Sequence, residues 1–143
     1  MKKKIFITGG SGLLALNWAL AVRDKVDVIL NMNNRDINLK GSLIKKINLH
    51  SINPIFNFLK SERPDYVLHT AGMTNVDDCE KNPNLAYETN VGLTENVARA
   101  CKNLEIPLIH ISTDHLFNGT SSLADEQKIT SPLNVYGKTK AEA

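Results

Sequence analysis

The sequence predicts an α/β fold in which helices cover both faces of a doubly wound parallel sheet. Short β-rich runs alternate with longer helical stretches along the 143 residues, which is the order of consecutive βαβ units. The run at residues 26–30 is apolar over nearly its whole length, as expected of a strand buried on both faces. The length allows one domain, which we place at residues 1–143.

The predicted elements follow one another in short steps. The predicted strands are residues 4–8, 26–30, 43–49, 66–69 and 107–111. Residues 13–22 form a helix that is apolar on most sides, so we expect it to be buried against the sheet. Residues 52–59 form a second helix, with Pro54 in its first turn. Residues 136–143 begin a further helix of about two turns without a C-terminal cap, which is marginal alone. We therefore expect the polypeptide to be truncated or to depend on another segment.

One stripe of a helix lies between the fourth and fifth strands. Its members are Ala86, Asn90, Leu93, Val97, Ala100, Cys101 and Leu104. Asn90 interrupts this otherwise apolar stripe, where an unpaired amide would cost about 1–3 kcal/mol. We therefore expect Asn90 to have a partner, either the backbone near a site or a buried structural hydrogen bond.

Composition narrows the class of protein. A net charge of +2 argues against a nucleic-acid binder, and no apolar run is long enough for a membrane span. Residues 8–12 interrupt the apolar stretch behind the N-terminal lysines, so a secretory signal is disfavoured. Cys79 and Cys101 fit a reducing compartment. We expect a cytoplasmic protein without a metal site, because the histidines and cysteines lack zinc-ligand spacing.

A glycine-rich turn, residues 8–12 (TGGSG), follows the first strand and opens the first helix. Gly9 would permit a tight turn, and Gly12 would let the backbone approach a pyrophosphate at the helix N-terminus. We assign Gly9, Gly12, Leu13 and Leu14 to dinucleotide binding, with a plain strand-to-helix turn as the alternative. A Walker loop fails because Pro132 stands where its first glycine is required. A nucleophile elbow fails because Leu13 replaces its last glycine.

The end of the second predicted strand bears on the choice of cofactor. NAD-binding folds usually place a carboxylate there, whereas residues 30–35 (LNMNNR) contain none and end in Arg35. Arg35 would suit the 2′-phosphate of NADP, so we predict NADP and keep NAD as the alternative. Arg35 could equally be a solvated loop charge.

Tyr136 and Lys140 lie four residues apart, so their side chains share one face of a helix. A nearby ammonium favours the phenolate, so the pair could exchange a proton with a carbonyl or an alcohol. Alone this spacing is a common accident. As evidence for such a proton-exchanging pair, the spacing carries more weight in a chain that also has a glycine turn in a βαβ domain.

Together these motifs resemble the extended short-chain dehydrogenase/reductases, and within them the dTDP-4-dehydrorhamnose reductase group. The motifs are residues 8–12, Ala71-Gly72, residues 112–119 (STDHLFNG) and residues 132–140 (PLNVYGKTK). The regulatory beta subunit of methionine adenosyltransferase belongs to the same group. The resemblance implies a Rossmann-type fold that binds NADP(H) or NAD(H).

The resemblance also implies residue roles. Tyr136 would donate the proton to a sugar carbonyl, and Lys140 would hold the nicotinamide ribose and favour the phenolate. Thr113 would hydrogen-bond the reacting oxygen. Ala71 and Gly72 would let the cofactor pass close to the backbone.

Reduction of a nucleotide-linked 4-keto-6-deoxysugar is the activity that the resemblance favours. The 4,6-dehydratases carry Thr-Asp-Glu where this chain has Thr113-Asp114-His115, so dehydration is disfavoured. A non-catalytic NADP-binding regulatory subunit and a nucleotide-sugar epimerase remain alternatives. The family's C-terminal substrate-binding region is absent from these residues, so we expect cofactor binding with negligible turnover by this chain alone. The sugar stays open, and so does the oligomeric state, a homo-oligomer included.

Overall fold

The computed structural model describes residues 2–35, 37–120 and 123–143. The chain divides into two compact units. The first consists of Met1–Ala71 and Leu93–Ile111, and the second of Gly72–Gly92 and Ser112–Ala143.

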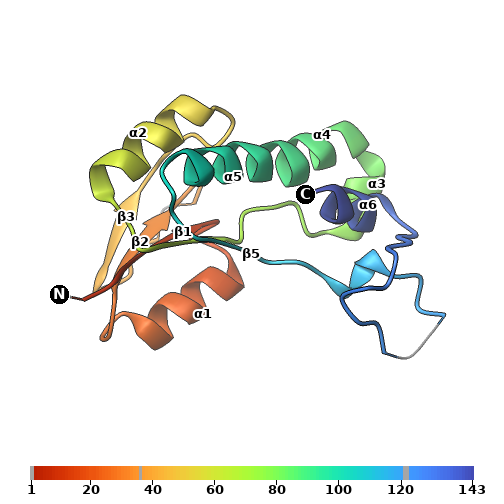
Figure 1. The fold of residues 1–143 in the computed structure, drawn as a ribbon, viewed down its shortest axis with the longest axis horizontal. Coiled ribbons are helices and arrows are strands. Elements are labelled where there is room, and N and C mark those ends of the chain that lie inside the picture. The colour runs from red at the N-terminus through yellow and green to blue at the C-terminus, as the bar shows by residue number, and fades with distance from the viewer. Residues whose placement is uncertain (1, 36, 121–122) are drawn as a thin grey trace. The chain divides into compact units, whose positions relative to one another are not determined.

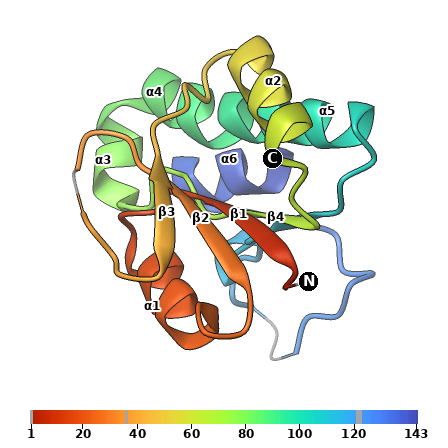
Figure 2. The same cartoon turned by 90° about the vertical axis from the view of Figure 1, so that its left-hand side faces the viewer.

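The first unit is built on a five-stranded parallel sheet with the strand order β3-β2-β1-β4-β5. Figure 2 shows β3, β2, β1 and β4 side by side in this order. The strands are β1 (Lys4–Thr8), β2 (Asp27–Asn31), β3 (Ser42–Lys45), β4 (Tyr66–His69) and β5 (Leu108–His110). The chain runs outward from β1 through β2 to β3, and then returns to the other side of β1 for β4. The carboxyl ends of β1 and β4 therefore flank the point where the strand order reverses, which is where open α/β sheets bind ligands.

Helices cover both faces of this sheet. Helix α1 (Leu13–Val22) lies on one face, and α2 (Ile52–Glu62) and α5 (Leu93–Asn103) lie side by side on the other (Figure 1). The alternation of side chains along β1 divides the core accordingly. Phe6 packs in the cluster under α2 and α5, and Ile5 and Ile7 pack in the cluster under α1. The predicted doubly wound Rossmann-type sheet is confirmed.

The predicted bounds are correct for β1, α1 and β4, and α2 runs three residues beyond its predicted end. The second strand is displaced by one residue, and β5 is one residue shorter at each end than predicted. The third predicted strand was too long, because β3 ends at Lys45. Beyond it the Asn31 side chain replaces strand pairing: Ile47 N donates to Asn31 Oδ1 at 2.7 Å, and Asn31 Nδ2 donates to Ile47 O at 3.2 Å.

Helix α1 is less buried than its sequence predicts. Only Ala15 and Ala19 are fully buried, whereas Leu13 is 83% exposed and Leu20 46%. The helix approaches the sheet through its small alanine side chains, so its larger apolar residues remain outside that contact. The expectation that α1 is buried against the sheet is confirmed at Ala15 and Ala19, although much of its apolar surface is exposed.

The second unit contains three short helices, α3 (Val76–Lys81), α4 (Pro83–Tyr87) and α6 (Val135–Glu142). It also contains a π-helical turn, η1 (Glu88–Gly92), and a 3₁₀ turn, η2 (Asp114–Leu116). The predicted helix between the fourth and fifth strands is present as α4, η1 and α5 in unbroken succession, and the members of its predicted stripe from Ala86 to Cys101 are buried. The wide turn contains Asn90, whose side chain bonds the backbone of Met73 rather than packing as an apolar stripe residue would.

Candidate functional site

The glycine turn joins the carboxyl end of β1 to α1 in the first unit. Gly9 has a φ of +65°, and a Cβ placed on it would lie 2.8 Å from the backbone nitrogen of Ala71. Gly10 N donates to Asn31 O at 2.8 Å, and Gly12 N donates to Gly9 O at 2.8 Å. The tight turn predicted at Gly9 is present, and its closeness to Ala71 allows no side chain there.

The N-terminus of α1 opens directly from this turn. Gly12 is the N-cap and supplies no side-chain cap. Gly12, Leu13 and Leu14 are exposed. The first amides of a helix have no acceptor within the helix, and the helix dipole places positive charge there. Glycine backbone beside exposed helix amides is a cradle that suits a pyrophosphate.

The end of β2 presents polar side chains without a carboxylate at the strand terminus. Asn31 is buried and its amide is engaged by Ile47. Asn33, Asn34 and Arg35 are exposed. A guanidinium is well suited to a phosphate monoester, and the contact of Arg35 with a 2′-phosphate stays a prediction.

Asn90 connects separate segments of the second unit. Its Oδ1 accepts from Met73 N at 2.6 Å, and its Nδ2 donates to Met73 O at 3.0 Å and to Thr139 Oγ1 at 2.9 Å. Gly72 stands close by, since a Cβ there would lie 3.0 Å from Asn90 Oδ1. The expectation that Asn90 has a partner is confirmed: it bonds the backbone of Met73 and the Thr139 side chain of α6, and a side chain at position 72 would crowd it.

Helix α6 carries Tyr136 and Lys140 one turn apart in the second unit. Tyr136 is half-buried, and its ring meets the ring of His115 edge to face at 5.4 Å between centroids. Lys140 is half-buried, and burial lowers the pKa of its ammonium. Thr139, between them, donates from Oγ1 to Tyr136 O at 2.8 Å.

Thr113 precedes η2 in the same unit. Its hydroxyl accepts from His115 N at 3.3 Å, so it acts as the N-cap of this turn. Gly137 brings α6 against the same segment, because a Cβ there would overlap the carbonyl oxygen of His115. Thr113, Tyr136 and Lys140 thus belong to one compact unit, and the glycine turn, Arg35 and Ala71 belong to the other.

Two side chains that accept hydrogen bonds from the first backbone amides of α6 were not predicted from the sequence. Asn134 Oδ1 accepts from Gly137 N at 2.7 Å, and Glu80 Oε1 accepts from Val135 N at 2.6 Å. Asparagine directly before a helix is a recognised N-cap signal and could have been found. Glu80 lies 55 positions away in sequence, so no local pattern indicates its contact.

Comparison with known proteins places this chain. A family model described as the RmlD substrate binding domain matches residues 2–143. The chain belongs to the RmlD family. The resemblance to the extended short-chain dehydrogenase/reductases, and within them to the dTDP-4-dehydrorhamnose reductase group, is thereby confirmed.

Individual proteins agree with the RmlD assignment. A structure of a hypothetical dTDP-4-dehydrorhamnose reductase from Sulfolobus tokodaii is 32% identical, with a TM-score of 0.87 over 99% of this chain and 50% of that one. The dTDP-4-dehydrorhamnose reductase of Bacillus anthracis, solved with NADP, is 27% identical, with a TM-score of 0.83 over 99% and 48%. Methionine adenosyltransferase 2 subunit beta of Pongo abelii is 33% identical over 98% of this chain and 41% of its own. The chain spans less than half the length of the curated relatives that it matches over nearly all its residues.

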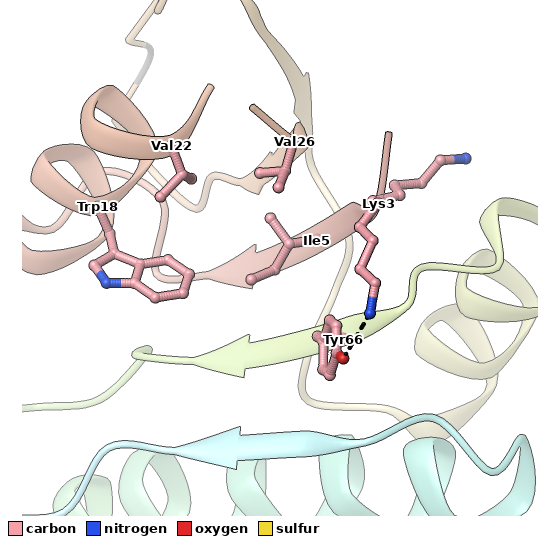
Figure 3. Close-up of a pocket in the computed structure, with 7 residues that line it drawn as sticks. Lys3, Ile5, Trp18, Val22, Val26 and Tyr66 are labelled. Atoms are coloured by element: carbon pink, nitrogen blue, oxygen red, sulfur yellow. Dashed lines mark hydrogen bonds between the residues drawn. The ribbon is translucent and has the colours of Figure 1, made fainter. Parts of the chain in front are cut away.

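Each unit of this RmlD-family chain has a hollow lined by described residues. One, of about 470 Å³, is lined in the second unit by Asp114, His115, Phe117, Asn118, Leu133 and Asn134, among others. The other, of about 200 Å³, lies in the first unit beside α1 (Figure 3). Its apolar lining comes from Ile5, Trp18, Val22, Val26 and Tyr66, and Lys3 Nζ donates to Tyr66 Oη at 3.0 Å at its edge. This second hollow lies at the amino-terminal ends of β1 and β4, at the opposite end of the strands from the glycine turn.

Neither a metal-binding cluster nor a membrane-spanning helix is present among the described residues. Within residues 2–35, 37–120 and 123–143, no three His, Cys, Asp or Glu side chains gather in a way that could hold a metal ion. No helix in these ranges has both the length and the apolar character to cross a membrane. Cys79 and Cys101 are buried free thiols.

Proposed function

We propose that this chain is the NADP(H)-binding part of a reductase acting on a nucleotide-linked 4-keto-6-deoxysugar. The observation that carries the proposal is the match of residues 2–143 to the RmlD family by a chain that keeps both Tyr136 and Lys140. The NADP complex of the Bacillus anthracis reductase supports the cofactor. The free cysteines suit a cytoplasmic setting, which we propose with it.

The first unit fits the cofactor through its backbone. The close approach of Gly9 to Ala71 leaves no room for a Cβ, and the exposed amides of α1 suit the pyrophosphate. Gly9, Gly12, Leu13, Leu14 and Ala71 would form this cradle. Arg35 would bind the 2′-phosphate, and Gly72, which follows Ala71 in the chain, would complete the backbone lining.

The second unit would supply the proton chemistry. NADPH, when bound, would supply the hydride for the carbonyl carbon at C4 of the sugar. Tyr136 Oη donates a proton to the carbonyl oxygen, which Thr113 hydrogen-bonds, and a hydroxyl group results. Lys140 would bind the nicotinamide ribose, and its ammonium would stabilise the phenolate left on Tyr136.

A regulatory role is the second candidate. The observation that favours it is the 33% identity with a methionine adenosyltransferase 2 subunit beta. Such a subunit would bind NADP without consuming it, so turnover separates the two candidates.

The proposal is tested in a chimera, in which residues 1–143 replace the matching half of the Bacillus anthracis reductase. We expect the chimera to oxidise NADPH when a dTDP-4-keto-6-deoxysugar is added, and Tyr136→Phe to lower kcat about 10²- to 10⁴-fold. Tyr87→Phe on the exposed face of α4 is the matched control and should leave kcat unchanged. A folded chimera that binds NADPH without turnover would favour the regulatory candidate. The 143-residue chain alone should show negligible turnover.

A further inference from the structure

A buried polar chain lies beneath the glycine turn in the first unit. Thr8 Oγ1 lies 2.7 Å from His69 Nδ1, and His69 Nε2 lies 3.1 Å from Thr94 Oγ1. The exposed fractions of Thr8, His69 and Thr94 are 0%, 1% and 4%. Thr8 and His69 are register partners at the carboxyl ends of β1 and β4. The hydrogen bonds among Thr8, His69 and Thr94 therefore join the two strands where the proposed cofactor site begins.

The hydroxyl of Thr8 has further partners that fix its orientation. It accepts from Thr70 N at 3.2 Å and from Ala71 N at 3.3 Å. A hydroxyl has one hydrogen and two lone pairs, and these two amides occupy both lone pairs. The hydrogen of Thr8 Oγ1 must therefore point to His69 Nδ1, which acts as the acceptor.

The tautomer of His69 follows from this count. An imidazole nitrogen that accepts a hydrogen bond carries no proton, and a neutral imidazole carries its proton on the other nitrogen. His69 is therefore neutral and protonated at Nε2, from which it donates to Thr94 Oγ1. The ring of His110 stacks on that of His69 at 5.6 Å between centroids and 25° between planes, which holds the His69 ring in place.

We infer that His69 is a positioning residue for the dinucleotide turn. Its unprotonated Nδ1 orients the Thr8 hydroxyl so that both lone pairs face the amides of Thr70 and Ala71. These bonds hold Ala71 against β1, where its backbone stands so close to Gly9 that a Cβ on Gly9 would clash. The functional part of this inference rests on the proposed dinucleotide site. The tautomer of His69 and the anchoring of Ala71 do not depend on that site.

The tautomer is measured by ¹H–¹⁵N correlation NMR of the imidazoles in the ¹⁵N-labelled chain at neutral pH without cofactor, with His69 assigned from a His69→Asn spectrum. We expect the ¹⁵N shifts of a neutral ring protonated at Nε2. A ring protonated at Nδ1, or a charged ring, overturns the inference whether or not NADPH binds.

The anchoring is measured by hydrogen exchange of the Ala71 amide and by NADPH titration. Thr8→Val removes the hydroxyl and His69→Phe removes both ring nitrogens, so each should speed exchange at Ala71 and weaken NADPH binding roughly three- to tenfold. His69→Asn keeps an acceptor near the position of Nδ1 and should restore most of both properties. Thr8→Ser keeps the hydroxyl and should resemble the unchanged chain, and Thr74→Val at an exposed position is the neutral control.

Two results would count against this role. One is an unchanged rate of hydrogen exchange at the Ala71 amide in folded Thr8→Val. This test remains valid even if His69→Phe does not fold. The other is a His69→Asn variant as impaired as His69→Phe. If the unchanged chain fails to bind NADPH while Ala71 exchange behaves as expected, the proposed function fails and the positioning role of His69 stands.

Discussion

Asn90 ties the loop after β4 and helix α6 to the π-helical turn through a single side-chain amide. Hydrogen bonds from this side chain reach Met73 and Thr139 over distances of 2.6–3.0 Å. An amide in an apolar stripe predicts that a partner exists, because a buried amide without one is costly. The identity of the partner could not be predicted, since Thr139 lies 49 positions away in sequence.

Replacing Asn90 tests how much these bonds stabilise the second unit. Asn90→Ala removes three hydrogen bonds and should lower the free energy of unfolding by about 2–4 kcal/mol, measured by urea denaturation. Asn84→Ala, at an exposed position on α4, should change it by less than about 0.5 kcal/mol. Equal stability of the two variants would show that Asn90 does not hold α6.

Ionisation of the Cys101 thiol should lower the stability of the folded state at alkaline pH. Burial raises the pKa of this thiol from the ordinary value of 9.0 to about 11. The unfolded chain loses this proton before the folded chain does, so the folded state binds more protons between these values. Stability contributed by this group is therefore complete below pH 9.0 and falls, by up to about 1.4 kcal/mol per pH unit, as the pH rises to about 11.

The variant Cys101→Ala isolates that contribution. Urea denaturation across this pH range should show a steeper decline for the unchanged chain than for the variant. Parallel stability curves would contradict the assignment of the pH dependence to Cys101, whatever other groups titrate there.

The elements differ in how far their own sequences determine them. The bounds of β1 and α1 were predictable because the glycine turn separates an apolar strand from a helix. The exposure of Leu13 and Leu20 on α1 was not, since it depends on how closely Ala15 and Ala19 let the helix approach the sheet. The end of β3 at Lys45 was likewise set by a non-local contact, the pairing of the Asn31 amide with Ile47.

Helix α2 is followed by a residue in a backbone conformation that its side chain disfavours. Arg63 is the C-cap, with φ 48° and ψ 57°, a left-handed conformation that glycine adopts more readily. Arg63→Gly should therefore raise the midpoint of thermal unfolding, with a gain of about 0.5–1 kcal/mol in stability. Arg99→Gly, within α5, is the opposite control and should cost about 1 kcal/mol. A destabilised Arg63→Gly chain would contradict this account of the helix end.

At the scale of the whole molecule, the predicted site residues are divided between the two compact units: the glycine turn belongs to the first, and Tyr136 and Lys140 belong to the second. The motif residues of the turn and of α6 could be located from sequence, because strand, glycine turn and Tyr–Lys spacing are local patterns. The long-range contacts that hold these motif residues in place could not be located from sequence. Thr8 meets His69 across 61 positions, and Val135 meets Glu80 across 55. Such pairs depend on the strand order and on helix docking, which only the folded chain specifies.

The central claim is that this chain binds NADP(H) through its glycine turn. The measurement that tests it most directly is a titration of the 143-residue chain with NADPH and with NADH, followed by nicotinamide fluorescence. We predict saturable binding about tenfold tighter for NADPH, and loss of that preference in Arg35→Ala but not in Arg63→Ala. Absence of saturable binding of either dinucleotide to the folded chain would contradict the claim. Equal or tighter binding of NADH would keep the dinucleotide site and remove Arg35 from it.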